Sequence, residues 1–242
     1  MAGPSPVEFL DHTDITFVEH PPPKLTPRER SEVDRMWQET RARNPATFDG
    51  PIAAALGVDR PHEGSLRVRW APMTYRARAL RSLRPPHEVP GSMFVTALVP
   101  TQTGVLIGRG APGTASPGVW ALPGGTVEPP VTRGRLDMAH LRRHAARELI
   151  EETGVSVRAE DLHLWAVTRG RRWGSLGFHF ACPTTCSELI LRRHAGLANI
   201  PCDQGLGPEL DEIAFVTSPP DAPALGPTSD YLLQVLNRYF IV

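Results

Sequence analysis

Residues 147–155 read RELIEETGV, and they close the strongest helix signal in the sequence, DMAHLRRHAARELIEETG at positions 137–154. Asp137 is a suitable N-cap, because its carboxylate can accept a hydrogen bond from the free N–H groups of the first turn. Gly154 stands where a glycine in the left-handed conformation commonly follows the last helical turn. The stretch therefore predicts a helix with a defined start and a defined end.

Three glutamates cluster near the end of this helix. Glu148, Glu151 and Glu152 are spaced i, i+3 and i+4, so an α-helix places them on one side. Leu149 and Ile150 then point to the other side, where they can pack into a core. The sequence predicts an amphipathic helix whose polar face carries three carboxylates.

The carboxylate cluster has two interpretations. Like charges at this spacing repel one another, and hard cations such as Mg²⁺ or Mn²⁺, which prefer oxygen ligands, would neutralise them. Divalent ions held in this way suit phosphoryl chemistry, because they polarise phosphate oxygens and lower the pKa of a bound water. The alternative is a solvated acidic face paired with Arg143 and Arg147, which is the commoner meaning of such a cluster standing by itself.

The residues around the cluster favour the metal interpretation. Positions 147–155 match Arg-Glu-hydrophobic-any-Glu-Glu-any-Gly-hydrophobic at every fixed place, and five fixed identities arise by chance at roughly one start in 10⁵–10⁶. The sequence LPGG at 122–125 precedes the helix, after two expected strands at 92–100 and 104–110. This pattern resembles the Nudix box, and the region 92–242 resembles a Nudix hydrolase domain.

The resemblance implies an α+β fold of the α/β/α sandwich type, in which a mixed β-sheet lies between helices. The residue patterns agree, because expected strands and helices are mixed without strict alternation. The further expected elements are a hairpin at 162–170 and 175–183, a helix at 187–197, a strand at 209–216 and a closing helix at 229–240 with Ser229 as N-cap.

The beginning of the box departs from the full pattern. The position eight residues before Arg147, where the pattern has its first glutamate, holds Ala139. Gly125 lies 22 residues before Arg147, eight more than the pattern expects. Extra residues therefore lie in the loop before the helix, and Asp137 or Glu128 is a candidate replacement for the first glutamate.

The resemblance also implies a role for each matching residue. Glu148 and Glu152 resemble the main metal ligands, and Glu151 resembles a ligand to a further ion or the group that activates water. The Gly124 carbonyl resembles the backbone ligand that precedes the helix. Arg147 resembles the arginine that orients a box glutamate by an ion pair. The implied cofactor is Mg²⁺ or Mn²⁺.

Nudix enzymes often add one more catalytic glutamate from a later strand or loop. The segment PELDEIAFV at 208–216 offers two candidates. Glu209 fits that place best and Glu212 is the second choice, although either can also be an ordinary surface acid.

Residues 1–91 precede the Nudix region and form an expected N-terminal α/β extension. The segment TPRE at 26–29 predicts a helix start with a capping box, and this helix should run to about Arg43. Short strands are expected at 14–19 and 65–71. We expect the extension to pack on the Nudix domain, or on a second copy in a homodimer, and to help shape substrate binding.

The box does not select a substrate, because the Nudix fold hosts many. The stretch WQETRARNPATFDGP at 37–51 resembles the N-terminal extension of the animal and plant UDP-glucose pyrophosphatases, which also share GG..EP before an inserted loop, as in 124–129. This implies metal-dependent hydrolysis of a nucleoside diphosphate derivative, preferably a UDP-sugar, to a nucleoside monophosphate and a sugar 1-phosphate. The alternatives are another nucleotide derivative or a prenyl diphosphate as substrate, and a nucleotide-sensing domain without catalysis.

Arginine is the expected phosphate contact, because its planar fork matches phosphate oxygens. The segment 60–84 holds seven arginines and one acid, which indicates either a solvated basic face or a surface that attracts an anionic substrate. Aromatic side chains can stack on a base, although core packing is their ordinary role. The candidates for substrate contact are Arg109, Arg76 and Arg78, and, by stacking, Tyr75, Trp70 and Trp173.

Composition limits the classes of partner that the sequence indicates. The formal net charge is zero, with 26 basic and 26 acidic residues, so charge indicates no nucleic-acid partner. No apolar run reaches the roughly 18 residues of a membrane helix, and the first residues lack a signal-peptide pattern. The spacing of Cys182, Cys186 and Cys202 fits no standard zinc site. We expect a cytoplasmic enzyme with reduced thiols that acts on a small molecule.

Overall fold

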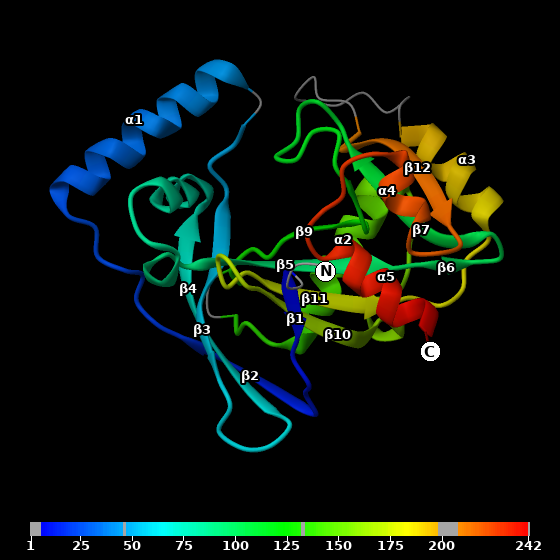
Figure 1. Cartoon of the computed structure of the whole chain (residues 1–242), viewed down its shortest axis with the longest axis horizontal. Coiled ribbons are helices and arrows are strands. Elements are labelled where there is room, and N and C mark those ends of the chain that lie inside the picture. Colours follow the sequence, from blue (N-terminus) through cyan, green and yellow to red (C-terminus); the bar gives the residue numbers. More distant parts are fainter. Residues whose placement is uncertain (1–5, 46, 132–133, 198–207, 242) are drawn as a thin grey trace, which may run out of the picture.

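The computed structural model describes residues 6–45, 47–131, 134–197 and 208–241. Most of its strands join one large sheet, in which β11 runs parallel to β5 and β2 parallel to β4, while the other pairs are antiparallel. The sheet is therefore mixed (Figure 1). Its strands follow the order β1 (Val7–Phe9), β10 (His163–Gly170), β11 (Leu176–Ala181), β5 (Gly91–Leu98), β3 (Pro51–Asp59), β4 (Ser65–Thr74) and β2 (Asp14–Glu19), with β9 (Gly124–Thr126) paired to β5.

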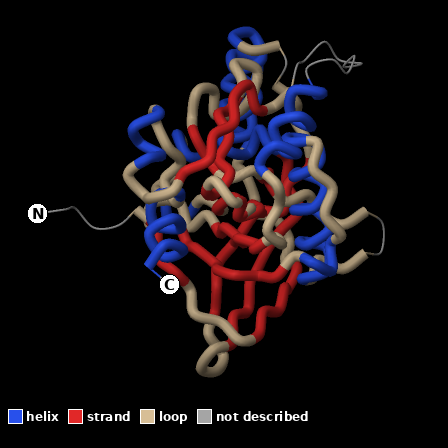
Figure 2. The backbone as a smooth tube through the Cα atoms, turned by 90° about the vertical axis from the view of Figure 1, so that its right-hand side faces the viewer, coloured by secondary structure: helices blue, strands red, loops and turns tan. Residues whose placement is uncertain are grey.

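A small sheet consists of β12 (Leu210–Val216), β7 (Gly104–Gly110) and β6 (Pro100–Thr101), with β8 (Trp120–Ala121) on β7. The helices are α1 (Pro27–Arg43), α2 (Met138–Thr153), α3 (Ser187–Leu197), α4 (Asp221–Leu225) and α5 (Leu232–Ile241), with 3₁₀ turns η1 (Tyr75–Ser82), η2 (Pro86–Glu88) and η3 (Ala159–Asp161). Figure 2 shows the strands gathered in the middle with helices around them. The predicted α+β class, with a mixed sheet among helices, is confirmed. No helix in the described ranges is long and apolar enough to cross a membrane.

Helix α2 forms where its caps predict it. The Asp137 side chain accepts a hydrogen bond from the backbone of the first turn, and Gly154 adopts a φ of 71° at the C-terminal end. Leu149 is fully buried, as expected, but Ile150 is 42% exposed. The buried face instead continues through Glu152, because Leu149 and Glu152 are spaced i and i+3 and so share one side of the helix.

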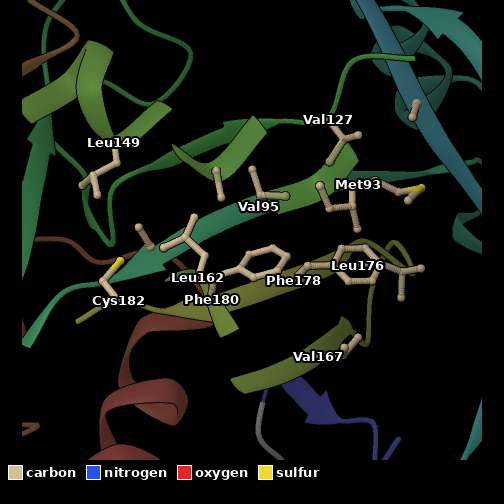
Figure 3. Close-up of a cluster of buried hydrophobic side chains, with 14 of the residues drawn as sticks. Met93, Val95, Val127, Leu149, Leu162, Val167, Leu176, Phe178, Phe180 and Cys182 are labelled. Carbon is tan, nitrogen blue, oxygen red and sulfur yellow. The ribbon is translucent and has the colours of Figure 1, made fainter. Parts of the chain in front are cut away.

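The core under α2 is built from the middle of the large sheet (Figure 3). Side chains of β5 and β11, including Met93, Phe178 and Phe180, pack with Leu149 in one cluster. Burial of each such side chain contributes roughly 1.5–3 kcal/mol to stability. Cys182 is a free thiol of the same cluster, so packing accounts for it. Cys186 is free and exposed, and Cys202 lies outside the described residues.

Helix α1 begins with the predicted capping box. The Thr26 hydroxyl accepts a hydrogen bond from the Glu29 backbone N–H at 3.2 Å, and Glu29 accepts one from the Thr26 backbone N–H at 2.8 Å. Arg84 fixes the same carboxylate through Nε at 2.6 Å. These contacts tie the helix to the segment that follows η1, and Figure 1 shows α1 standing beside η1 rather than on the sheet.

Several elements differ from the expectations. β3 and β1 were not predicted, since β3 is rich in alanine and β1 is short, and both strands gain their stability by pairing with distant strands, β3 with β4 and β5, and β1 with β10. α4 lies in a proline-rich segment, 217–227, that is outside the elements expected from the sequence. The closing helix starts at Leu232, so Ser229 is not its N-cap. Ser229 instead donates its backbone N–H to the Trp120 carbonyl.

One buried histidine lies in the large sheet. His179 has no exposed surface, and its Nδ1 and Nε2 lie 2.8 Å from the hydroxyls of Thr96 and Thr168. Burial lowers the pKa of His179 to about 3. In the unfolded chain His179 therefore takes up a proton near the ordinary histidine pKa of about 6.5. In the folded chain its imidazole stays uncharged until the pH is far lower.

We expect this histidine to make the fold sensitive to acid. Between pH 7 and pH 5 only the unfolded state gains the proton, so the free energy of unfolding should fall by about 2 kcal/mol from this group. Urea unfolding at both pH values measures the change. His179→Gln should remove this part of the pH dependence of the free energy of unfolding. His163→Gln, at an exposed position, should keep it. An equal slope in wild type and His179→Gln would contradict the assignment.

Candidate active site

Glu152 is the buried acid of the site. It is 5% exposed, and its Oε2 accepts a hydrogen bond from the Gly124 backbone N–H at 2.7 Å. Burial raises the pKa of Glu152 well above its usual range, and the Gly124 hydrogen bond opposes that rise. The negative charges of Glu148, Glu209 and Glu151 raise it further, so these four acids lie within electrostatic reach of one another.

Glu148 lies one turn before Glu152 and faces the other glycine of the pair. Its side chain is 12% exposed, and its Oε1 lies 2.9 Å from Nε2 of His144 and 3.6 Å from Nη2 of Arg147. A Cβ added at Gly125 would come within 2.5 Å of the Glu148 carboxyl group. Gly125 is therefore needed because β9 passes directly against the Glu148 carboxylate, whereas a Cβ at Gly124 would meet the backbone of Val95 in β5.

The two remaining glutamates lie toward solvent. Glu151 is exposed, with its Oε2 3.8 Å from Nε of Arg147, and partial burial and the charge of Glu148 raise its pKa. Glu209, just before β12, also has a raised pKa, caused by loss of solvent contact and by the charges of Glu148 and Glu151. Glu212 turns instead to Arg109, 2.8 Å away, so the structure brings Glu209 rather than Glu212 to the helix glutamates.

Glu128 lies beside Arg147 of the box. Its Oε1 accepts a hydrogen bond from Nη2 of Arg147 at 2.8 Å, and its charge contributes to the raised pKa of Glu151. Asp137 serves as the N-cap of α2, accepting from the His140 backbone N–H at 2.7 Å. Of the two candidates for the missing box glutamate, Glu128 is therefore the one placed beside the box.

The buried His144 is a site residue that sequence reasoning missed. The sequence could have indicated it, because His144 lies four residues before Glu148 and this spacing places the two side chains on one helix face. A histidine there can hold the Glu148 carboxylate in one orientation.

A pocket of about 300 Å³ opens beside the carboxylates. We call it the glutamate pocket. It is lined by both sheets, by η1 and by the segment before α5, and its lining includes Arg78, Thr96, Gly124, Glu152, Glu209 and Tyr231.

A second pocket of about 350 Å³ adjoins it and shares Thr114 and Ala115 with it. This adjoining pocket is lined on its other side by Asn44, Phe48 and Tyr75. The side chain of Phe48 is 77% exposed, and Asn44 donates a hydrogen bond to the Gly113 carbonyl at 3.2 Å. The N-terminal part of the chain thus contributes walls to both pockets.

The structure does not bring two of the predicted phosphate contacts to the glutamate pocket. Arg109 pairs with Asp211 at 2.9 Å and with Glu212. Arg76 pairs with Asp34 at 3.0 Å and with Asp49 at 3.2 Å. Both guanidinium groups are therefore held by acids outside the pocket lining.

The aromatic candidates divide in the same way. Tyr75 lines the adjoining pocket, while Trp70 is 3% exposed and packs in the core. Trp173 packs beside the cluster formed by Val33, Leu80 and Val89. Among these three, only Tyr75 lines one of the two pockets beside the box glutamates.

The donor set fits a hard divalent cation. Among the described residues, no three His, Cys, Asp or Glu side chains already converge as a metal site. Several carboxylates nevertheless raise one another's pKa at one place, with Glu152 buried among them. A cation would favour their charged forms, and carboxylate and carbonyl oxygens are the ligands that Mg²⁺ and Mn²⁺ prefer.

Comparison with known proteins assigns the class. A family model described as the NUDIX domain matches residues 91–218, more than half of the 242 residues. The chain therefore belongs to the Nudix family. It is a Nudix hydrolase, an enzyme that acts on diphosphate-containing substrates.

Several solved structures are similar at low identity. A MutT protein from Methanosarcina mazei Go1 is 20% identical, with a TM-score of 0.42, over 63% of this chain and 94% of that one. A NUDIX hydrolase from Nitrosomonas europaea is 19% identical, with a TM-score of 0.42, over 65% and 84%. A bifunctional NMN adenylyltransferase/ADP ribose pyrophosphatase from Francisella tularensis is 15% identical, with a TM-score of 0.41, over 68% and 44%. No curated protein matches the chain, and the family assignment rests on the matched domain.

Proposed function

We propose that this Nudix hydrolase cleaves the diphosphate linkage of a nucleoside diphosphate sugar, with UDP-sugars as the preferred class. The products are a nucleoside monophosphate and a sugar 1-phosphate. The observation that carries the proposal is one pocket that combines Glu152 and Glu209 with Arg78, beside Glu148 and Glu151. Acids that attract cations and an arginine that attracts phosphate oxygens are what a diphosphate substrate requires.

The preference for a UDP-sugar is supported by the stretch at 37–51. Its resemblance to the UDP-glucose pyrophosphatases comes from sequence, and its residues Asn44, Thr47 and Phe48 line the adjoining pocket. A substrate with its diphosphate in the glutamate pocket can extend a nucleoside or a sugar past Thr114 and Ala115 into this space. The exposed ring of Phe48 offers a surface on which a base can stack.

Nudix enzymes generally use divalent metal ions. In this chain we assign the metal ligands to Glu148, Glu151, Glu152 and the Gly124 carbonyl. Bound there, Mg²⁺ or Mn²⁺ supplies Lewis-acid polarisation of the phosphate oxygens. Arg147 holds the Glu128 carboxylate and lies near Glu148 and Glu151, so it positions the acids rather than touching the substrate.

A carboxylate of the protein accepts the proton of the attacking water. Water attacks one phosphorus atom of the P–O–P link, the bond from that phosphorus to the bridging oxygen breaks, and the leaving phosphoryl group departs with the bridging oxygen. Glu151 and Glu209 are the candidates for this base, because both carboxylates lie on the exposed side of the acid cluster, where water can reach them.

A substrate screen tests this function. UDP-glucose, UDP-galactose, GDP-mannose, ADP-ribose, NADH and geranyl diphosphate are incubated with the enzyme in Mg²⁺ and then in Mn²⁺, with a phosphatase that releases phosphate from monophosphate products. We expect phosphate release to be highest with the two UDP-sugars and to disappear when EDTA removes the metal. Cleavage of ADP-ribose or geranyl diphosphate in their place would overturn the UDP-sugar assignment. Failure to cut any of them, with a nucleotide still raising the melting temperature, would favour a nucleotide-sensing role.

A further inference from the structure

The segment YRARALR places three side chains on one face of η1. In a 3₁₀-helix, residues i and i+3 eclipse one another, so Tyr75, Arg78 and Arg81 form one row along the turn. Arg76 lies off this row, which explains why it pairs with Asp34 and Asp49 instead. Within this row, Arg78 lines the glutamate pocket and Tyr75 lines the adjoining pocket.

Arg78 is the only positively charged side chain among the described residues that line the glutamate pocket. Its Nη1 donates a hydrogen bond to the Tyr75 hydroxyl at 2.9 Å, and its Cζ lies 5.0 Å from the centre of the Tyr75 ring. Within the described ranges no carboxylate forms an ion pair with it, in contrast to Arg76, Arg84 and Arg109. The Arg78 guanidinium is thus oriented by an aromatic ring at the pocket wall, and no carboxylate in the described part of the chain neutralises it by an ion pair.

Arg81 stands behind Arg78 on the same row. Its Nη2 donates to the Ser92 hydroxyl at 3.2 Å, its Cζ lies 5.3 Å from the Trp173 ring, and its buried Nε has no hydrogen-bond partner. Burial, and then the charge of Arg78, lowers the pKa of Arg81 to about 10. Arg172 stacks on the Trp173 ring as well, with its Cζ 5.1 Å from the centre. Arg81 and Arg172 therefore add positive charge behind Arg78. The Asp230 carboxylate acts on Arg81 as a counter-charge.

Packed like charges are unfavourable unless an anion joins them. We propose that Arg78 binds the phosphoryl group of the diphosphate that does not lie on the glutamates, and that Arg81 reinforces this subsite from behind. The inference rests on the proposed function, since it places one phosphoryl group at the acids and the other at the arginine. Because Arg78 belongs to η1 and not to the box, the segment before residue 91 then recognises the diphosphate itself.

Binding in the absence of metal isolates this subsite from the chemistry. Inorganic pyrophosphate in EDTA is titrated calorimetrically into wild type, Arg78→Gln, Arg78→Lys and Arg67→Gln. Arg67 is a matched control, because it is an exposed arginine of β4 that does not line the pocket. We expect Arg78→Gln to weaken binding roughly 10–100-fold, as loss of charge-assisted hydrogen bonds predicts, and Arg67→Gln to bind like wild type. Arg78→Lys keeps the charge but loses the fork, so its affinity should fall in between.

Steady-state kinetics supply the second measurement, with a diphosphate substrate that the wild-type enzyme hydrolyses. Arg78→Gln should raise KM far more than it lowers kcat, because the contact is present in the bound substrate before the bond breaks. Wild-type protein that does not bind pyrophosphate in EDTA, or Arg78→Gln protein that binds it as wild type does, would overturn the subsite. If UDP-sugars are not hydrolysed while Arg78→Gln still loses pyrophosphate binding, the subsite stands and only the proposed substrate falls.

Discussion

Glu152→Gln is expected to lower kcat by roughly three orders of magnitude, a loss of about 4 kcal/mol of transition-state stabilisation. Glutamine keeps the size of the side chain, and its amide oxygen can still accept the hydrogen bond that the Gly124 N–H donates at 2.7 Å. Only the negative charge is lost, and with it a proposed metal ligand at a buried position of the site. Steady-state rates in Mg²⁺ and Mn²⁺ titrations with each protein measure the two effects separately.

The same substitution should stabilise the metal-free fold. Burial raises the pKa of Glu152, which means that its ionised form is costly in the folded chain, and at neutral pH glutamine removes that cost. The melting temperature of Glu152→Gln in EDTA should therefore equal or exceed that of the wild type, although its kcat in the presence of metal is much lower. Glu160→Gln is the matched control, since the Glu160 side chain is 70% exposed in the turn η3. This substitution should leave the melting temperature and kcat unchanged. Wild-type turnover in Glu152→Gln would refute the metal assignment.

Gly125→Ala is expected to lower kcat about 100-fold, the size of effect that follows when a reacting group is misplaced by about 1 Å. The new Cβ would lie 2.5 Å from Cδ and Oε2 of Glu148, closer than two such atoms approach. The carboxylate must then leave the position in which His144 holds it at 2.9 Å. We expect weaker Mn²⁺ binding together with the lower rate.

The fold should survive this change, because the atoms in the way are the end of a side chain and not backbone. Gly196→Ala is the control, since this exposed glycine of α3 has open space around its Cβ position. Circular dichroism and the melting temperature check that both alanine variants are folded. Full activity in Gly125→Ala would show that Glu148 need not lie against β9 for catalysis.

The sequence alone was sufficient for features that depend on nearby residues. The helix α2, its caps and the capping box of α1 follow from contacts within one turn, so their bounds were predicted within a residue. The grouping of Glu148, Glu151 and Glu152 follows from helical periodicity in the same way. The family followed from the box, whose spacing can be counted along the chain.

The tertiary structure decided which side chains meet across long distances in the sequence. Arg109 was predicted as a phosphate contact, but β7 pairs with β12 so that Arg109 lies opposite Glu212 and its charge is already neutralised. The sequence offered Arg76 and Arg78 alike, and the 3₁₀ turn η1 decided that they lie on different faces. Glu128 was brought to Arg147 by the course of the inserted loop. Local rules act within a few residues, whereas sheet register and loop packing depend on partners far along the chain, and only the folded structure determines them.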